Sequence, residues 1–250
     1  MKRNFLFVIF PFRDTILTKI FCKERIKMRP RNKKHLEERF EKCSNIVIAD
    51  PAALKGKWRS VFVSEDDKVM PLHLEIGCGK GAFVTGMAQK NPDVSFVAME
   101  CVKNVIVTAM EKTETLGYKN IIFINNNADF LCEYFEEGEV DKIYLNFSDP
   151  WPRNKHAKYR LTHENYLKRY EKILAPDGCI VQKTDNRGLF DYSVESFTEN
   201  GWRLENVTYN LHSDETPAEI LAANVITEYE NRFMELGQPI HRLEAYLPKR

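Results

Sequence analysis

From residue 72 onward, short apolar runs alternate with segments in which apolar residues recur every three or four positions. The short runs are typical of buried strands, and the longer segments have the period of helices. Parallel strands need crossover helices that cover both faces of the sheet, so the alternation predicts an α/β fold with a mostly parallel, doubly wound sheet. The expected strands span 72–76, 94–99, 121–124, 142–147 and 179–183, and the expected helices 82–89, 102–116, 131–135, 162–174 and 188–200.

The C-terminal part of the chain departs from this alternation. Residues 202–211 and 240–247 have the composition of strands, and a loop and a helix over 227–236 separate them. With the earlier strands they would complete a seven-stranded sheet. Hydrophobic patterning does not report strand direction, so the orientation of this last pair stays open at this point.

Three glycines, Gly77, Gly79 and Gly81, stand between the first strand and the first helix. Glycine lets the backbone turn sharply and approach a ligand, and the N–H groups that open a helix favour polar or anionic groups. This order predicts a site for the polar part of a nucleotide-like cofactor. With Ala82 the spacing also fits the dinucleotide fingerprint, so a nicotinamide enzyme is an alternative, as is a tight turn without ligand. Cys78 is interpreted as a small packing residue.

Two polar positions follow the next two strands. Glu100 comes about twenty residues after the glycines, where an acid at the carboxyl end of a strand can bind ribose hydroxyls. Asn127 lies in the polar segment 125–129 after the third strand, where an amide could pair with the exocyclic amine of a base. The alternatives are a surface acid at the start of a helix and a plain polar loop.

The most distinctive stretch follows the fourth strand. Asp149 comes first, and Pro150 and Pro152 stiffen the backbone on either side of Trp151. A basic run with one tyrosine comes next: Arg153, Lys155, His156, Lys158, Tyr159 and Arg160. An acid and an aromatic ring beside clustered cations favour recognition of an unstacked base whose phosphates are held nearby. The alternative is an exposed charged loop.

Composition narrows the class of protein. The 250 residues, 43% of them apolar, are enough for one sizeable core, and the formal net charge of +1 requires any nucleic-acid surface to be a local patch. Six cysteines contain no C-x-x-C pair and no histidine at zinc spacing. We therefore expect reduced thiols, a cytoplasmic protein and no metal site.

The N-terminal residues differ from the rest of the chain. Residues 1–27 combine Lys2 and Arg3 with an apolar run too short to span a membrane, and no small-residue cleavage site follows. We expect a dispensable extension or a misassigned start. Residues 28–70 are expected to form a basic arm with helices, including one over 33–43. The arm is either a solvated leader or a nucleic-acid contact.

Four motifs together resemble the bacterial tRNA (guanine-N7)-methyltransferase family. They are Glu75–Gly81, Asn146–Pro152, Lys183–Asn186 and Thr227–Glu230, and the resemblance runs from Arg29 to the C-terminus. It implies that residues 71–250 form a class I S-adenosylmethionine-dependent, Rossmann-like domain with seven strands and an antiparallel C-terminal strand. It also implies methylation of a variable-loop guanosine, position 46 of tRNA.

The resemblance assigns roles to residues. Cofactor contacts would come from Glu75, Gly77, Gly79, Gly81, Glu100, Asn127 and Asp149, and Asp149 would also be catalytic. Arg153, Asp185, Thr227, Glu228, Tyr229 and Glu230 would meet the guanosine, and Lys155, His156, Lys158, Tyr159 and Arg160 the RNA. Two positions depart from the family pattern: Asn127 replaces a common aspartate and Arg153 a common lysine. The oligomeric state is open, with a homodimer among the possibilities.

Three other functions stay open alongside this one. A nicotinamide oxidoreductase would leave the basic run unexplained and would bind NADH tightly. A non-catalytic RNA-binding protein would not need Glu75, the glycines and Glu100. A methyltransferase acting on a small molecule or a protein would have activity that RNase does not abolish.

Overall fold

The computed structural model describes residues 34–62 and 69–248. All of these residues belong to one compact unit, Asn32–Arg250. The expectations for residues 1–27 and for the basic cluster up to residue 33 lie outside the described residues.

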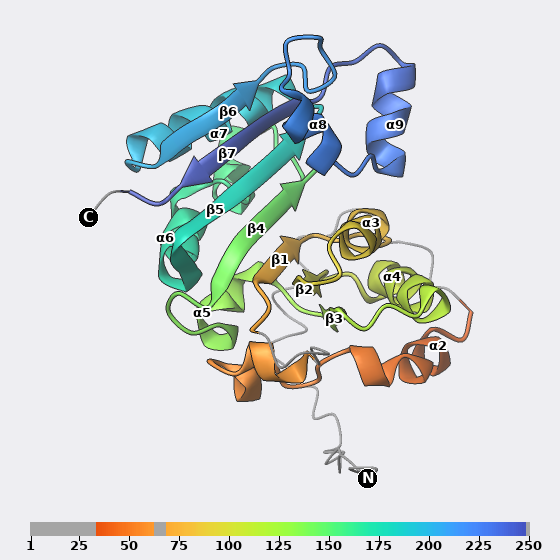
Figure 1. Cartoon of the computed structure of the whole chain (residues 1–250). Coiled ribbons are helices and arrows are strands. Elements are labelled where there is room, and N and C mark those ends of the chain that lie inside the picture. The colour runs from red at the N-terminus through yellow and green to blue at the C-terminus, as the bar shows by residue number, and fades with distance from the viewer. Residues whose placement is uncertain (1–33, 63–68, 249–250) are drawn as a thin grey trace. The chain divides into compact units, whose positions relative to one another are not determined.

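One seven-stranded sheet forms the centre of this unit, in the order β3-β2-β1-β4-β5-β7-β6 (Figure 1). The first five strands are parallel, and β7 runs antiparallel to both β5 and β6. The predicted fold class is therefore confirmed, including the antiparallel C-terminal strand. The strands are β1 (Leu72–Ile76), β2 (Ser95–Met99), β3 (Ile121–Ile124), β4 (Val140–Asn146), β5 (Leu174–Thr184), β6 (Arg203–Thr208) and β7 (His241–Tyr246).

Helices cover both faces of the sheet (Figure 1). Within β2, Val97 and Met99 belong to one apolar cluster, and Phe96 and Ala98 belong to the other, so the strand is buried on both sides. The helices are α2 (Leu36–Lys42), α3 (Ala82–Lys90), α4 (Lys103–Leu116), α5 (Leu131–Tyr134), α6 (Glu164–Ile173), α7 (Arg187–Glu199), α8 (Ala218–Ala223) and α9 (Glu228–Glu235).

The helix predicted to start at Thr162 begins two residues later. His163 is the N-cap of α6, and its side chain accepts the N–H of Asn165. The Thr162 hydroxyl is buried and lies 2.8 Å from the Ser193 hydroxyl of α7. A tertiary hydrogen bond therefore holds the Thr162 side chain, and the next residue caps the helix.

The described residues before β1 are part of the same core. Trp58 is fully buried, stacks on Phe135 and donates its indole N–H to the Tyr134 carbonyl at 2.8 Å. The buried Glu139 carboxylate accepts the backbone N–H groups of Gly56, Trp58 and Glu136. The helix expected over 33–43 is found as α2, and its Phe40 is buried in the cluster that also contains α3 and α4 residues.

A buried ion pair ties the C-terminal segment to the sheet. Lys183, at the end of β5, donates to Glu230 of α9 at 2.6 Å, and both side chains are almost fully buried. The same ammonium donates to Asn224 Oδ1 at 2.7 Å and to the Val225 carbonyl at 3.1 Å. Burial lowers the pKa of Lys183, while Glu230 opposes this shift. All three N–H groups of the ammonium have acceptors, as a buried charge requires.

This pair leads to a prediction about stability. Lys183→Met leaves the Glu230 carboxylate buried without its counter-charge, so the free energy of unfolding should fall by about 3–5 kcal/mol. Replacing both residues, Lys183→Met with Glu230→Met, should recover much of that loss because the apolar pair leaves no buried charge. Urea unfolding measures both values.

Lys168→Met provides the control, because Lys168 forms an exposed pair with Glu164 one turn away on the same helix. Its effect should stay within about 0.5 kcal/mol. If Lys183→Met were as stable as this control, the stabilising role of the Lys183–Glu230 pair would be contradicted.

Candidate functional site

The glycine turn lies at the carboxyl end of β1, where the sheet order switches between β1 and β4. Gly77, Gly79 and Gly81 all have positive φ, at 81°, 57° and 79°. A Cβ atom added to Gly77 or Gly79 would meet nothing within 4 Å, whereas one on Gly81 would lie 2.7 Å from the Cβ of Ala109 in α4. The first two glycines therefore leave room for a ligand, and the third lets two helices approach.

Glu100 contacts this turn directly. Its Oε2 accepts the N–H of Gly79 at 3.2 Å, and its Oε1 accepts the N–H of Val102, the N-cap of α4, at 2.9 Å. The structure thus brings together the glycine turn and the acid that follows the second strand. Two backbone bonds fix the carboxylate at the end of β2, where it can hold hydroxyl groups of a ligand.

Glu75 and Asn146 form a buried polar pair at the ends of β1 and β4. The Asn146 side chain donates to Glu75 Oε1 at 3.1 Å. Glu75 Oε2 and Asn146 Oδ1 are buried and have no hydrogen-bond partner among the described residues. Burial raises the pKa of Glu75 from 4.5 to about 7. Two unpaired acceptor oxygens beside the glycine turn fit a ligand that brings N–H or O–H donors.

Asn127 lies after β3 and caps the short 3-10 helix Ala128–Phe130. Its Oδ1 accepts the N–H of Asp129 at 3.1 Å, and its amide donates to Asp129 Oδ2 at 2.9 Å. Tyr166 of α6 donates to the other carboxylate oxygen of Asp129. The amide therefore stands at the expected edge of the sheet, and its contact with the cofactor stays a prediction.

Asp149 is exposed on the turn that follows β4. Phe147 and Trp151, two residues before and after it, have φ values of 50° and 42°. Such values cost of order 1–3 kcal/mol for a non-glycine residue and persist only where surrounding contacts impose them. The Phe147 N–H donates to the Lys183 carbonyl at 2.8 Å, which is one such contact.

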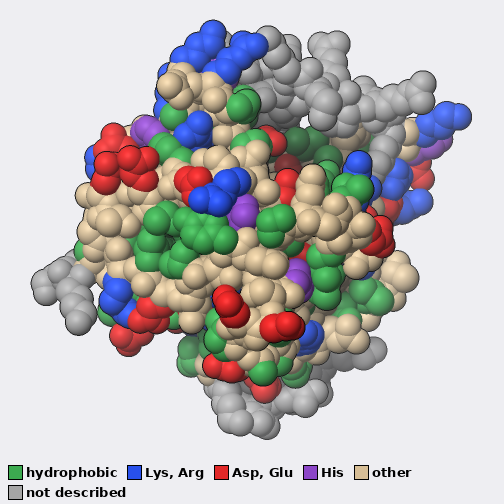
Figure 2. All heavy atoms as spheres, turned by 90° about the horizontal axis from the view of Figure 1, so that it is seen from above, with side chains coloured by type: hydrophobic (Ala, Val, Ile, Leu, Met, Phe, Trp, Pro, Cys, Tyr) green, Lys and Arg blue, Asp and Glu red, His purple; other side chains and the backbone are tan. Residues whose placement is uncertain are grey.

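The basic run forms a 3-10 helix over Asn154–Tyr159 beside this turn. The rings of Trp151, His156 and Tyr159 form a cluster, with Trp151 5.3 Å from Tyr159 and 5.8 Å from His156. Among the predicted RNA contacts and their neighbours, the side chains of Arg153, Lys155 and Lys158 are exposed. Figure 2 looks down on the molecule from above and shows Lys and Arg side chains at the top of that view, near its centre and at its right margin, with Asp and Glu side chains between them.

Arg160 differs from the other cations of the run. Its guanidinium donates to the backbone carbonyls of Pro150 and Trp151 and lies 4.2 Å from the ring centre of Tyr192. The side chain expected to contact RNA thus makes several contacts within the protein.

The other residues predicted to contact the guanosine come from two further elements. Asp185 directly follows β5 and is partly exposed. Thr227 caps α9 by accepting the N–H of Glu230, and Tyr229, which is 63% exposed, stacks near Phe147 at 6.2 Å. Glu228 is exposed, but Glu230 has no exposed surface. The structure therefore places Glu230 in the protein interior, whereas Glu228 and Tyr229 lie at the surface.

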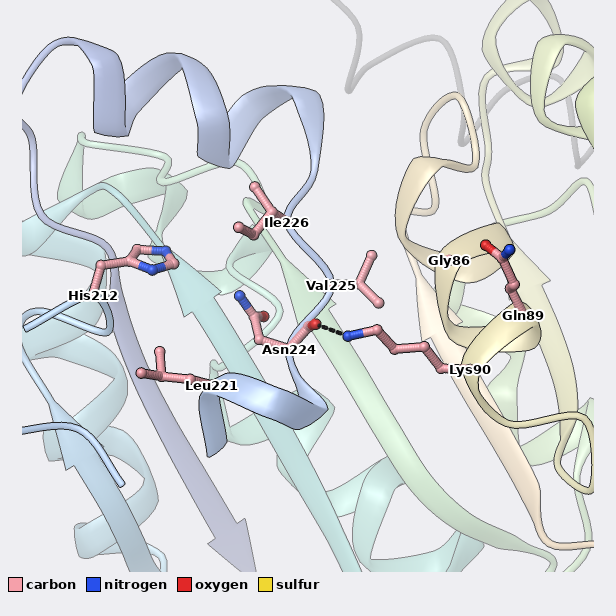
Figure 3. A pocket seen from close by; sticks show the side chains of 8 residues that line it. All are labelled: Gly86, Gln89, Lys90, His212, Leu221, Asn224, Val225 and Ile226. Carbon is pink, nitrogen blue, oxygen red and sulfur yellow. Dashed lines mark hydrogen bonds between the residues drawn. The ribbon is translucent and has the colours of Figure 1, made fainter. Parts of the chain in front are cut away.

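A cavity of about 540 Å³ lies between α3 and the segment before α9 (Figure 3). Lys90 spans it and donates to the carbonyls of Ala222 and Asn224. None of the predicted site residues lines this cavity, so it is separate from the glycine turn. Its walls are Gly86, Gln89, Lys90, His212, Leu221, Asn224, Val225 and Ile226.

Sequence reasoning gave no role to several residues that shape the site. Asn146 and Lys183 stand inside quoted motifs, and Lys183 carried a usable signal, because it is a charged residue in an otherwise apolar strand. His212 and Asn224, which also contact Glu230, carried no such signal. Their contacts arise only from the tertiary fold.

Other findings concern cysteine, metal and membrane chemistry. Cys78 is buried, and burial raises the pKa of its thiol well above the ordinary value, in agreement with a packing role. Across residues 34–62 and 69–248, no three His, Cys, Asp or Glu side chains are grouped so that they could hold a metal ion. Over the same residues, no helix is long and apolar enough to cross a membrane.

Comparison with known proteins identifies close relatives. A family model described as "Putative methyltransferase" matches residues 69–243. The tRNA (guanine-N(7)-)-methyltransferase of Bacillus licheniformis is 47% identical over 218 residues, which cover 87% of this chain and 98% of that protein. The protein of the same name from Bacillus subtilis is 45% identical, with the same coverage of both chains.

Two solved structures share the fold at low sequence identity. A 30S ribosomal A1408 methyltransferase from an uncultured bacterium has a TM-score of 0.52 and 15% identity, covering 79% of this chain and 93% of that chain. The 16S rRNA methyltransferase KamB has a TM-score of 0.52 and 14% identity, covering 88% and 95%. At this identity the likeness concerns the fold alone.

The raised pKa of Glu75 predicts a pH dependence of stability. Between pH 4.5 and about 7 the carboxyl is ionised in the unfolded chain and protonated in the native protein, so the native state binds more protons. The stability that this group contributes is complete below pH 4.5 and is lost as the pH rises through 7. Glu75→Gln removes this dependence.

Urea unfolding at pH values from 4.5 to 7.5 measures the effect. The unfolding free energy of wild type relative to Glu75→Gln should fall across this window, by an amount on the order of 3 kcal/mol. Glu219→Gln, at an exposed position of α8, is the surface-charge control. A difference between wild type and Glu75→Gln that does not change with pH would refute the assignment.

Proposed function

The chain belongs to the bacterial tRNA (guanine-N7)-methyltransferase family, and we propose that it transfers a methyl group from S-adenosylmethionine to N7 of a guanosine in tRNA. The observation that carries the proposal is the shared edge of the sheet. There, the glycine turn follows β1 and is hydrogen-bonded to Glu100. The exposed Asp149 follows β4, the neighbouring strand, and an aromatic and basic segment comes directly after it. A cofactor pocket and an RNA surface would meet at this edge.

The residues present fit the proposed cofactor. Glu100 is fixed where it can accept ribose hydroxyls, and Gly77 and Gly79 leave open space at the turn. Glu75 and Asn146 offer two buried acceptor oxygens to a donor group such as an ammonium. Asn127 can still accept from an adenine amine, so the departure from aspartate should preserve binding. When bound, S-adenosylmethionine supplies a methyl group activated on a sulfonium.

The chemistry proposed for this chain's residues is mainly orientation. Guanine N7 carries an in-plane lone pair and no proton, so no general base is needed to expose it. The guanine gains positive charge on alkylation, and a carboxylate beside its N1–H and N2 edge can stabilise that charge. Asp149 and Asp185 follow adjacent parallel strands and are two candidate carboxylates for this role. If the turn that carries Asp149 holds the base in position, the activation free energy of methyl transfer is lowered.

The proposed RNA surface is the basic run that follows Asp149 in the chain. The exposed side chains of Arg153, Lys155 and Lys158 can neutralise phosphates of tRNA. The family implies a variable-loop guanosine, position 46, as the target. Arginine at position 153 keeps the charge of the usual lysine and offers a planar set of donors to the guanosine. A cytoplasmic setting is part of the same proposal.

The glycine turn yields a prediction that separates binding from folding. Gly79→Ala places a methyl group in the proposed cofactor space, so affinity for S-adenosylmethionine should fall at least tenfold. The positive φ at residue 79 should lower the free energy of unfolding of the alanine variant by only about 1–2 kcal/mol. Calorimetric titration and urea unfolding give the two values.

Gly81→Ala is the matched comparison. Its Cβ overlaps Ala109, so its stability loss should be larger, about 2–4 kcal/mol, and Ala109→Gly in the same chain should relieve part of it. Equal effects of the two glycine variants on stability and on cofactor affinity would argue against this division of roles.

Asp149 yields a prediction about rate. Asp149→Asn keeps the shape of the side chain but removes the negative charge, so kcat/KM for tRNA methylation should fall by about 10²–10³-fold. Because the side chain is exposed, the unfolding free energy should change by no more than about 0.5 kcal/mol. Transfer of labelled methyl groups to unmodified tRNA measures the rate.

Asp191→Asn is the control, because Asp191 is an exposed acid of α7 that pairs with Arg187 on the same helix. Near-normal turnover by Asp149→Asn would reject the role of Asp149. For the function itself, wild-type activity that survives RNase treatment would favour a different methyl acceptor, and tight NADH binding without methyl transfer would favour an oxidoreductase.

A further inference from the structure

The guanidinium of Arg160 supports the turn that carries Asp149. Its Nε donates to the Pro150 carbonyl at 3.0 Å and its Nη2 to the Trp151 carbonyl at 3.1 Å. The guanidinium carbon also lies 4.2 Å from the ring centre of Tyr192, on α7. One side chain therefore joins two consecutive carbonyls of the turn to a helix on the sheet.

The turn needs an external support because its own backbone offers few donors. Pro150 and Pro152 have no N–H group, so neither can donate a backbone hydrogen bond there. Trp151 between them has a φ of 42°, which a non-glycine residue holds only under constraint. Arg160 supplies the two donors that fix the carbonyls on this part of the turn.

The neighbouring cations differ from Arg160 in their surroundings. Arg153, Lys155 and Lys158 are exposed, whereas Arg160 is partly buried and its donors reach the backbone of the turn. The planar fork of arginine suits two adjacent carbonyls, and the single ammonium of lysine does not reproduce it. The charge of Arg160 therefore serves the shape of the turn more than the attraction of phosphate.

We propose that Arg160 is a positioning residue that holds Asp149 and Trp151 in the geometry required for methyl transfer and does not bind tRNA phosphate. The proposal rests on the proposed function, because it assigns the role of Arg160 in that same reaction. It separates two groups within the basic run: an outer group that contacts RNA and one arginine that supports the catalytic turn.

Arg160→Lys is the decisive variant, since it keeps the positive charge and removes the fork. We expect kcat to fall about tenfold or more, because small misplacements of reacting groups are costly in rate. The dissociation constant for tRNA and its dependence on salt should stay as in wild type. Lys158→Ala is the matched comparison: it should weaken tRNA binding and reduce the slope of log K against log salt by about 0.7–0.9.

A second readout does not depend on methyl transfer. The chain contains three tryptophans, and Trp58 and Trp202 are buried away from the turn. In protein labelled with 5-fluorotryptophan, the fluorine resonance of Trp151, assigned with Trp151→Phe, should shift or broaden in Arg160→Lys while the other two stay unchanged. Tyr192→Ala removes the ring on which the Arg160 guanidinium stacks. This variant should change the same resonance and should also reduce kcat.

The outcomes separate the two claims. An unchanged Trp151 resonance with normal kcat in Arg160→Lys would overturn the positioning role. In Arg160→Gln, which removes the charge, a loss of salt dependence equal to that of Lys158→Ala would overturn the claim that Arg160 does not bind tRNA phosphate. If wild type failed to methylate tRNA, the proposed function would fail, yet the resonance of Trp151 would still decide whether Arg160 holds the turn. If Arg160→Gln did not fold, Arg160→Lys and Tyr192→Ala would still test the positioning role through the Trp151 resonance and kcat.

Discussion

The buried pair of Lys183 and Glu230 is the contact on which the rest of the site depends. Lys183 stands at the end of β5, directly opposite Asn146 in β4, and its backbone carbonyl accepts the N–H of Phe147. Its ammonium holds Glu230 together with the chain that precedes α9. One residue thus fixes both the turn that carries Asp149 and the helix that carries Tyr229. A charge removed from water requires such complete pairing, which makes the arrangement rigid.

The carboxyl edge of the sheet divides into two halves with different physical tasks. At β1 and β2, left-handed glycines and the backbone-bonded Glu100 form an open cradle with fixed acceptors. At β4 and β5, a constrained turn presents an exposed acid beside aromatic rings and cations. Parallel strands bring these halves together because all their carboxyl ends meet at one edge. For alkylation of a lone pair, this preorganised geometry supplies most of what the enzyme must contribute.

The sequence predicted the fold and the strand ends at which the candidate site residues lie, because both follow from local signals. The strand and helix periods, the glycine triplet and the acids at strand ends are all readable within short windows. The contacts that hold the site are long-range. Glu230 looked like a surface contact in a Thr-x-x-Glu motif, yet it pairs with a lysine 47 positions away. Arg160 looked like one more cation, and the carbonyls it holds could not be inferred from charge alone. The positive φ of Trp151 is likewise not encoded in any local sequence pattern.

The most direct test of the central claim is the identity and position of the methylated nucleoside. Unmodified tRNA would be incubated with the protein and S-adenosylmethionine, and the product mapped by chain cleavage selective for N7-methylguanosine. Methyl transfer to N7 of the variable-loop guanosine should give a single cleavage site at that guanosine, and none when the cofactor is omitted. A methyl group on another atom, or no transfer to tRNA by protein that binds the cofactor, would contradict it.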